Sequence, residues 1–119
     1  MKLKYCEINY IQEKDAIFCK WLQKCSGEDY RKPLKRGLEL FKETKATTWI
    51  TDTTNGFENE REDTLWLVEE FIPQTIQSSC KRVVFIIDAK SPLKEEIDEQ
   101  SRALGEYFEV LQVDSLEKV

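Results

Sequence analysis

The chain has 119 residues, a length suited to one hydrophobic core, and we expect a single domain over residues 1–119. Leu, Ile, Val and Phe make up 32 residues, enough apolar content to exclude a disordered chain. The net charge of −5 disfavours general nucleic-acid binding, and the absence of histidine excludes His-dependent hydrolases and His-ligated zinc sites.

The first predicted element is a β-hairpin. Residues 4–10 and 16–22 are mostly β-branched, aromatic or Cys and alternate with an approximate period of two. The polar residues 12–15 between them are typical of a turn. We therefore expect two neighbouring antiparallel strands.

A helix is predicted after the hairpin. Ser26 is suited to the N-cap position, and the acidic residues that follow it are stabilised by the partial positive charge of a helix start. Apolar residues then recur at helical spacing up to about Lys45, and Gly37 lies on the same stripe, where it lets the helix approach the sheet closely. Because proline tolerates only the first helical turn, the helix either begins at residues 29–30 or is kinked near Pro33.

The middle of the chain is predicted to form two strands separated by a helix. Residues 47–51 are rich in β-branched and aromatic side chains and stop at a turn-forming stretch, residues 52–56. A second helix is expected over residues 58–78, and Pro73 should bend or break it. Residues 82–87 are apolar on both faces, which is typical of an interior strand, and we expect residues 83–87 to form the central strand.

The last predicted elements are a helix over residues 92–104, closed by Gly105, and a strand over residues 107–113. The resulting order, β-β-α-β-α-β-α-β, predicts an α/β fold whose later strands are joined by right-handed parallel crossovers. Such crossovers between neighbouring strands place the helices on one side of the sheet. Either the strand order is shuffled or a second subunit covers the other face.

The cysteines contain no C-x-x-C pair and mostly lie in or beside apolar runs, so we expect reduced, buried thiols. They are Cys6, Cys19, Cys25 and Cys80. A disulfide between Cys19 and Cys25 is the alternative. Residues 1–5 hold no apolar segment of a secretion signal, and the longest apolar run, residues 83–87, falls far short of the roughly 20 residues that span a bilayer. We expect a cytoplasmic protein without a transmembrane segment.

The second predicted helix is apolar over much of its circumference. Its main stripe consists of Leu65, Val68, Ile72 and Ile76. Trp66 lies roughly 100° from the centre of that stripe, and Leu67 and Phe71 widen the apolar arc on the other side. Such a helix either packs against two elements or presents a surface to a partner, which makes Trp66, Leu67 and Phe71 candidate interface residues.

The first predicted helix carries a stripe of positive charge. Its members are Arg31, Lys35, Lys42 and Lys45. The stripe is suited to an acidic partner protein or an anionic membrane surface. The alternative is an ordinary solvated face with ion pairs along the helix.

Three short motifs and three further residues form a pattern over the first two thirds of the chain. They are SGEDY at 26–30, GLEL at 37–40, KATTW at 45–49, Asp52, Trp66 and Pro73. In this pattern and in its element order, the chain resembles small uncharacterised bacterial proteins of the SpoIIAA-like, or STAS-like, fold. The resemblance implies a mixed five-stranded sheet of successive βα units. Anti-sigma-factor antagonists, domains of anion transporters and, more loosely, Sec14-type lipid-binding domains share this fold without a common chemistry.

In the anti-sigma antagonists, a phosphorylatable Ser stands in an Asp-Ser-x-Gly setting at a helix start, just after a strand that ends in Asp. By this resemblance Asp52 matches the strand end, and Thr53 and Thr54 are the candidate phospho-acceptors in the loop behind it. The helix start itself departs from the pattern, because residues 58–63 hold four carboxylates, which repel a phosphate group.

Asp52 and Asp88 are the candidate loop acids. Each follows a predicted parallel strand, at the sheet edge where α/β proteins usually bind ligands. Two carboxylates there could hold Mg²⁺ for phosphoryl transfer, or each could simply cap a turn or the next helix. No Gly-rich phosphate loop accompanies them, so we predict neither a metal nor a cofactor.

We therefore expect a non-catalytic protein-interaction or regulatory module of STAS-like type that self-associates as a homodimer and has a protein partner. Two alternatives stay open. One is a Mg-dependent phosphoryl-transfer enzyme that uses Asp52 and Asp88. The other is a small-molecule or lipid-binding module.

Overall fold

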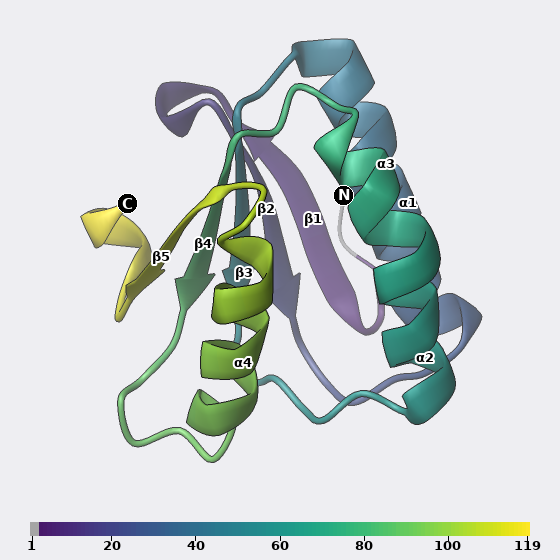
Figure 1. Cartoon of the computed structure of the whole chain (residues 1–119), viewed down its shortest axis with the longest axis vertical. Helices are drawn as coiled ribbons and strands as arrows, with labels where there is room; N and C mark the ends of the chain where they lie inside the picture. The colour runs from purple at the N-terminus through teal and green to yellow at the C-terminus, as the bar shows by residue number, and fades with distance from the viewer. Residues whose placement is uncertain (1–2) are drawn as a thin grey trace.

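The computed structural model describes residues 3–119, so the first two residues of the segment searched for a secretion signal lie outside it. The described residues form a mixed five-stranded sheet with helices, which confirms the expected α/β class (Figure 1). The strands are β1 (Cys6–Ile11), β2 (Ala16–Trp21), β3 (Thr48–Asp52), β4 (Arg82–Ile86) and β5 (Glu109–Val113). The longer helical segments are α1 (Glu28–Thr44), α2 (Arg61–Trp66), the π-helical η2 (Leu67–Phe71), α3 (Ile72–Ile76) and α4 (Lys94–Leu104). Two 3-10 turns are η1 (Gln12–Lys14) and η3 (Leu116–Lys118).

The strands lie side by side in the order in which the chain forms them, β1-β2-β3-β4-β5. β1 and β2 pair antiparallel, as the hairpin prediction requires, and all later neighbours pair parallel. The middle strand is β3, so the prediction that residues 83–87 form the central strand is wrong: three strands lie on one side of β4 and one, β5, on the other. β4 is still an interior strand, and its residues Val83 to Ile86 are buried.

The helices cover one face of the sheet, which we call the helix face. It carries residues such as Ile17, Cys19 and Val83, which form one cluster with the buried side chains of α1 and α4. A Cβ at Gly37 in α1 would collide with the indole of Trp49. The prediction that Gly37 allows a close approach of helix and sheet is therefore confirmed.

The opposite face, which we call the open face, is not covered by a long helix within residues 3–119. Its buried apolar side chains are Ala16, Ile50, Val84 and Ile86. Leu116 and Val119 of the C-terminal segment pack on them, and the carbonyl of Val119 accepts a hydrogen bond from Nζ of Lys14 at 3.3 Å. Figure 1 shows this segment on the far side of the sheet from α1 and α3. The strand order is not shuffled, and the chain's own C-terminal segment covers part of the face.

α1 begins one residue earlier than expected and runs past Pro33 as one helix, Glu28–Thr44. Its N-cap is Gly27 and not Ser26. Gly27 has a φ of 61°, a conformation that glycine adopts without steric cost. The N-cap prediction was therefore wrong by one position.

The helix expected over residues 58–78 consists of α2, η2 and α3. Pro73 has no N–H, so it cannot donate the hydrogen bond that an α-helix requires at that position. Immediately before it, the N–H of Ile72 donates to the carbonyl of Leu67, five residues back, which is the bonding of a π turn. The expected disturbance at Pro73 therefore takes the form of a π turn and not of a break.

All four cysteines are free and buried, and the alternative disulfide between Cys19 and Cys25 is not formed. The sulfur atoms of Cys6 and Cys19 lie 3.4 Å apart in a hydrogen bond. This hydrogen bond and burial raise the pKa of Cys19. Among the helices of residues 3–119, none is long and apolar enough to cross a membrane.

Candidate functional site

An apolar cavity of about 110 Å³ lies on the helix face. Its floor is formed by β3 and β4, and its walls by η2 and α3 on one side and α4 on the other. The apolar residues of the walls include Leu67, Phe71, Ile72, Leu93, Ile97 and Leu104. Figure 1 shows α4 standing apart from α1, α2 and α3 in front of the sheet. A mostly apolar hollow with few polar groups is typical of a small-molecule site.

The floor of the cavity follows from strand alternation and register. Trp49 lies opposite Val83, and two residues further along Thr51 lies opposite Phe85, so all four side chains point to the helix face. Nε1 of Trp49 donates a hydrogen bond to Oγ1 of Thr51 at 2.6 Å. Because the indole N–H is paired within the floor, the surface turned toward the cavity is mainly apolar.

Aromatic side chains from the sheet, α1, η2 and the β3–α2 loop form part of the wall. Trp21 stacks on Tyr30 with a centroid distance of 5.1 Å and meets Phe57 edge-on at 5.6 Å. Trp49 meets Phe71 edge-on, also at 5.6 Å. Aromatic pairs of this geometry contribute about 0.5–1.5 kcal/mol beyond the burial of their area. These contacts hold the wall in place without a ligand.

Two polar pairs border the cavity. Nδ2 of Asn59 donates a hydrogen bond to the Tyr30 hydroxyl at 3.0 Å, and burial raises the pKa of Tyr30. On α4, Oε1 of Glu96 accepts a hydrogen bond from Gln100 at 3.4 Å, whereas its Oε2 is buried without a hydrogen-bond partner in the described chain. Burial, together with repulsion from Glu58, raises the pKa of Glu96.

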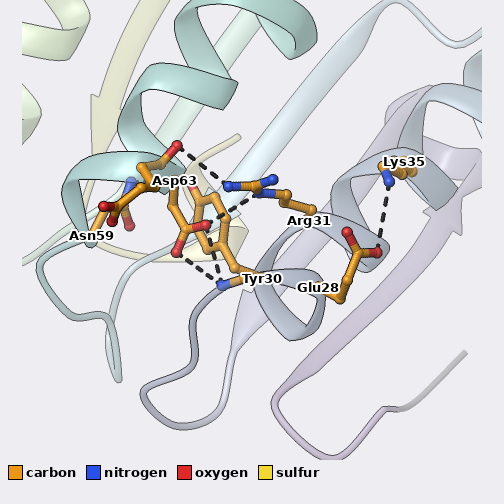
Figure 2. Close-up of polar contacts among 8 residues, drawn as sticks. Glu28, Tyr30, Arg31, Lys35, Asn59 and Asp63 are labelled. Atoms are coloured by element: carbon orange, nitrogen blue, oxygen red, sulfur yellow. Dashed lines mark hydrogen bonds and ion pairs between the residues drawn. The ribbon is translucent and has the colours of Figure 1, made fainter.

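The buried carboxylate of Asp63 ties the start of α1 to α2. It accepts hydrogen bonds from the backbone N–H of Gly27 at 3.1 Å and from Nε of Arg31 at 3.2 Å (Figure 2). The guanidinium of Arg31 also lies over the ring of Trp66, 5.7 Å from its centroid. The negative charge is stabilised here by the first turn of α1 and by Arg31. This network fixes the helix turn that carries Tyr30 into the cavity wall.

The buried side of the second predicted helix differs from the expected one. Three members of the predicted inner stripe are exposed apolar side chains, Leu65, Val68 and Ile76, with exposures of 47%, 55% and 40%. The buried positions are Asp63, Phe71 and Thr75, which recur at multiples of four residues. Two of them are polar, and the sequence reading missed them because it followed apolar residues alone. The spacing of four residues was the available signal.

The candidate loop acids each close their own turn. Oδ1 of Asp52 accepts hydrogen bonds from the N–H of Thr54 at 2.9 Å and from its hydroxyl at 2.6 Å, and Oδ1 of Asp88 accepts the N–H of Lys90 at 2.8 Å. Of the candidate phospho-acceptors, Thr54 is exposed, and Thr53 is buried and donates to the carbonyl of Ile86. Within residues 3–119, no group of three or more His, Cys, Asp or Glu side chains is placed to hold a metal ion.

The predicted basic stripe of α1 is divided by its contacts. Arg31 turns toward Asp63, whereas Lys35 stays exposed, with its Nζ 3.7 Å from the carboxylate of Glu28 (Figure 2). Lys42 and Lys45 are also exposed. The solvent-facing part of the stripe therefore consists of three lysines.

The candidate interface residues pack against the core to different degrees. Phe71 is buried, and Trp66 and Leu67 are half-buried. Trp66 contacts Phe71, with ring centroids 5.9 Å apart, and meets Tyr30 edge-on at 6.5 Å. Leu67 and Phe71 line the cavity. In the single chain, all three face other parts of the fold to some extent.

A scan against protein-family models and searches of curated proteins and of solved structures found no match to this chain.

Proposed function

We propose that the protein is a binding module that holds a small apolar molecule in the cavity between η2–α3 and α4. The observation that carries this proposal is the cavity itself, of about 110 Å³, with an aromatic wall and a floor whose indole N–H is already paired. Sites of this composition are the default place for a small ligand. The π turn η2 forms part of one wall, and π turns often accompany functional sites.

A phosphoryl-transfer role receives less support from the contacts. To bind Mg²⁺, Asp52 would compete with its two hydrogen bonds from Thr54, and Asp88 with its bond from Lys90. Neither aspartate lines the cavity. A turn-capping role accounts for both side chains.

The resemblance to SpoIIAA-like proteins remains part of the proposal. A mixed five-stranded sheet with helices over one face is compatible with that fold. The same fold group includes lipid-binding domains of Sec14 type, which agrees with a binding role. We place the module in the cytoplasm, where reducing conditions suit its four free thiols.

The binding proposal is tested by filling the cavity. Ile72→Phe adds volume at a lining position, and the matched control Ile76→Phe makes the same change one turn further along α3, at an exposed position. We expect toluene to shift the NMR signals of cavity residues in the wild type and in Ile76→Phe but not in Ile72→Phe. Absence of shifts in the folded wild type would contradict the proposal, as would equal shifts in the two variants.

A second candidate function, self-association as an interaction module, is favoured by the exposed side chains Leu65, Val68 and Ile76. A contiguous exposed apolar surface marks an interaction site. A separate groove between α1 and the α2–α3 segment is lined by Lys35 and Lys42 and by the acidic Glu39 and Glu70. A second copy in two-fold arrangement can place the lysines of one chain against the acids of the other.

Sedimentation at micromolar concentration tests the self-association. We expect a dimer in the wild type and a monomer after the double change Leu65→Ser and Val68→Ser. The control Leu111→Ser removes an exposed apolar side chain from β5 and should keep the dimer. A monomeric wild type would remove this candidate function.

A further inference from the structure

The cavity borders one polar group whose hydrogen bonding is incomplete. Oε2 of Glu96 is buried without a partner in the described chain, while the neighbouring polar pairs, Trp49 with Thr51 and Asn59 with Tyr30, satisfy each other. A buried carboxylate oxygen without a donor is unfavourable. Glu96 lines the cavity, so a rotation of its side chain can bring this oxygen to a donor that a ligand supplies.

The charged side chain in the cavity lining is acidic. The lining, as far as residues 3–119 form it, includes Glu96 and neither Lys nor Arg, and Glu58 adds negative charge nearby. An anionic ligand such as a fatty acid or a phosphate is repelled by this arrangement. The aromatic rings of Trp21, Tyr30 and Phe57 line the same space, and ring faces attract cations.

The size of the cavity limits the body of the ligand. An apolar cavity of roughly 150 Å³ holds a benzene molecule. At about 110 Å³, with one side open toward solvent, this cavity suits a single ring or a short branched alkyl group and not an acyl chain. The volume of the cavity therefore favours a compact ligand, and its negative charge favours a ligand with a cationic head group.

We infer that the cavity binds a primary amine carried on a compact apolar body, whose ammonium group pairs with the Glu96 carboxylate once a rotation of this side chain turns the enclosed Oε2 toward the cavity, while the ring lies among the aromatic walls. This inference rests on the proposed function, because it names the class of molecule that the same cavity takes. The Glu96 carboxylate then selects for the positive charge of the ligand. The apolar walls supply the part of the binding free energy that does not depend on this charge.

Three probes of similar size separate the two proposals: benzylamine, toluene and benzoate, titrated into the protein and followed by NMR. We expect the wild type to bind benzylamine about tenfold more tightly than toluene, since a hydrogen bond to a charged group is of that magnitude, and not to bind benzoate. Glu96→Gln keeps the shape of the side chain and should bind the two probes equally. Glu99→Gln removes a charge from an exposed position of the same helix and should keep the preference.

The outcomes distinguish the amine inference from the binding function. Toluene binding by Glu96→Gln shows that the variant is folded with an intact cavity. If the folded wild type binds toluene and benzylamine equally, or binds benzoate, the amine inference is overturned and the binding function stands. The amine inference is also overturned if Glu96→Gln and Glu99→Gln reduce the preference by the same factor. If none of the probes binds, both proposals fail.

Discussion

The two faces of the sheet are covered in different ways. On the helix face, α1, η2–α3 and α4 lie over large rings such as Trp49 and Phe85, and a cavity of about 110 Å³ remains between them. On the open face, the short C-terminal segment around η3 helps to cover Ala16, Ile50 and Val84, which are fully buried at 0% exposure.

The amount of secondary structure over a face does not decide how completely that face is shielded from solvent. Small and β-branched side chains make an even surface, and a few residues of chain together with Phe18 and Val113 are enough to bury its centre. Large rings between diverging helices leave space, because rigid side chains in their preferred rotamers cannot close every gap. The face with more secondary structure is consequently the one that offers a binding site.

The largest expected effect is on the open face. Val84→Asp places an unpaired carboxylate at a fully buried position, which costs several kcal/mol against a total stability of about 5–15 kcal/mol for a domain, so the protein should unfold. Circular dichroism during heating provides the measurement. Leu111→Asp is the matched control, because Leu111 lies opposite Val84 on β5 but is exposed, and this variant should melt cooperatively. A cooperative melting transition of Val84→Asp would mean that position 84 on the open face is not buried from solvent.

A smaller effect is expected on the helix face at Asp63. Asp63→Asn removes the charge that pairs with Arg31 and the N–H of Gly27, and it should lower the free energy of unfolding by about 2–4 kcal/mol. Urea unfolding measures this change. Glu62→Gln, at the exposed neighbouring position, should change the free energy by less than about 0.5 kcal/mol. Equal effects of the two variants would show that the network does not hold α1 and α2 together.

The cover of the open face can be weakened directly. Leu116 is half-buried against the open-face cluster, so Leu116→Ala should lower the free energy of unfolding by about 1–2 kcal/mol. The exposed neighbour Glu117 provides the control Glu117→Ala, which should leave the urea midpoint almost unchanged. If neither variant changes the urea midpoint, packing of the C-terminal segment on the open face does not contribute to stability.

The smallest expected effect concerns pH and the cavity wall. The pKa of Glu96 is raised in the folded chain by burial and by Glu58 and Glu99, so ionisation of Glu96 opposes folding. Its unfavourable contribution is absent at a pH below the ordinary glutamate value and develops as pH rises through the raised pKa. Glu96→Gln should therefore be slightly more stable than the wild type at pH 7 and equal to it at low pH. Urea midpoints measured across this range check the sign, and a variant that is less stable at pH 7 contradicts it.

Residue patterns predicted the positions of the strands and long helices with small errors at the ends. β2 and β4 lie within the expected segments 16–22 and 82–87, and α1 ends one residue before the expected Lys45. These elements follow from local periodicity, which neighbouring residues determine. The approach of α1 at Gly37 also followed from a single residue without a side chain.

The α/β class and the burial of β4 follow from residue patterns alone, because a continuous apolar run is stable only as an interior strand. The side of α2 and α3 that faces inward depends on tertiary contacts. Asp63 is buried because Gly27 and Arg31, 36 and 32 residues away in the chain, supply its hydrogen bonds, and no local pattern contains those partners. The cavity and the cover of the open face likewise depend on contacts between distant segments. Periodicity reports which residues are apolar, whereas burial of a given face depends on what packs against it.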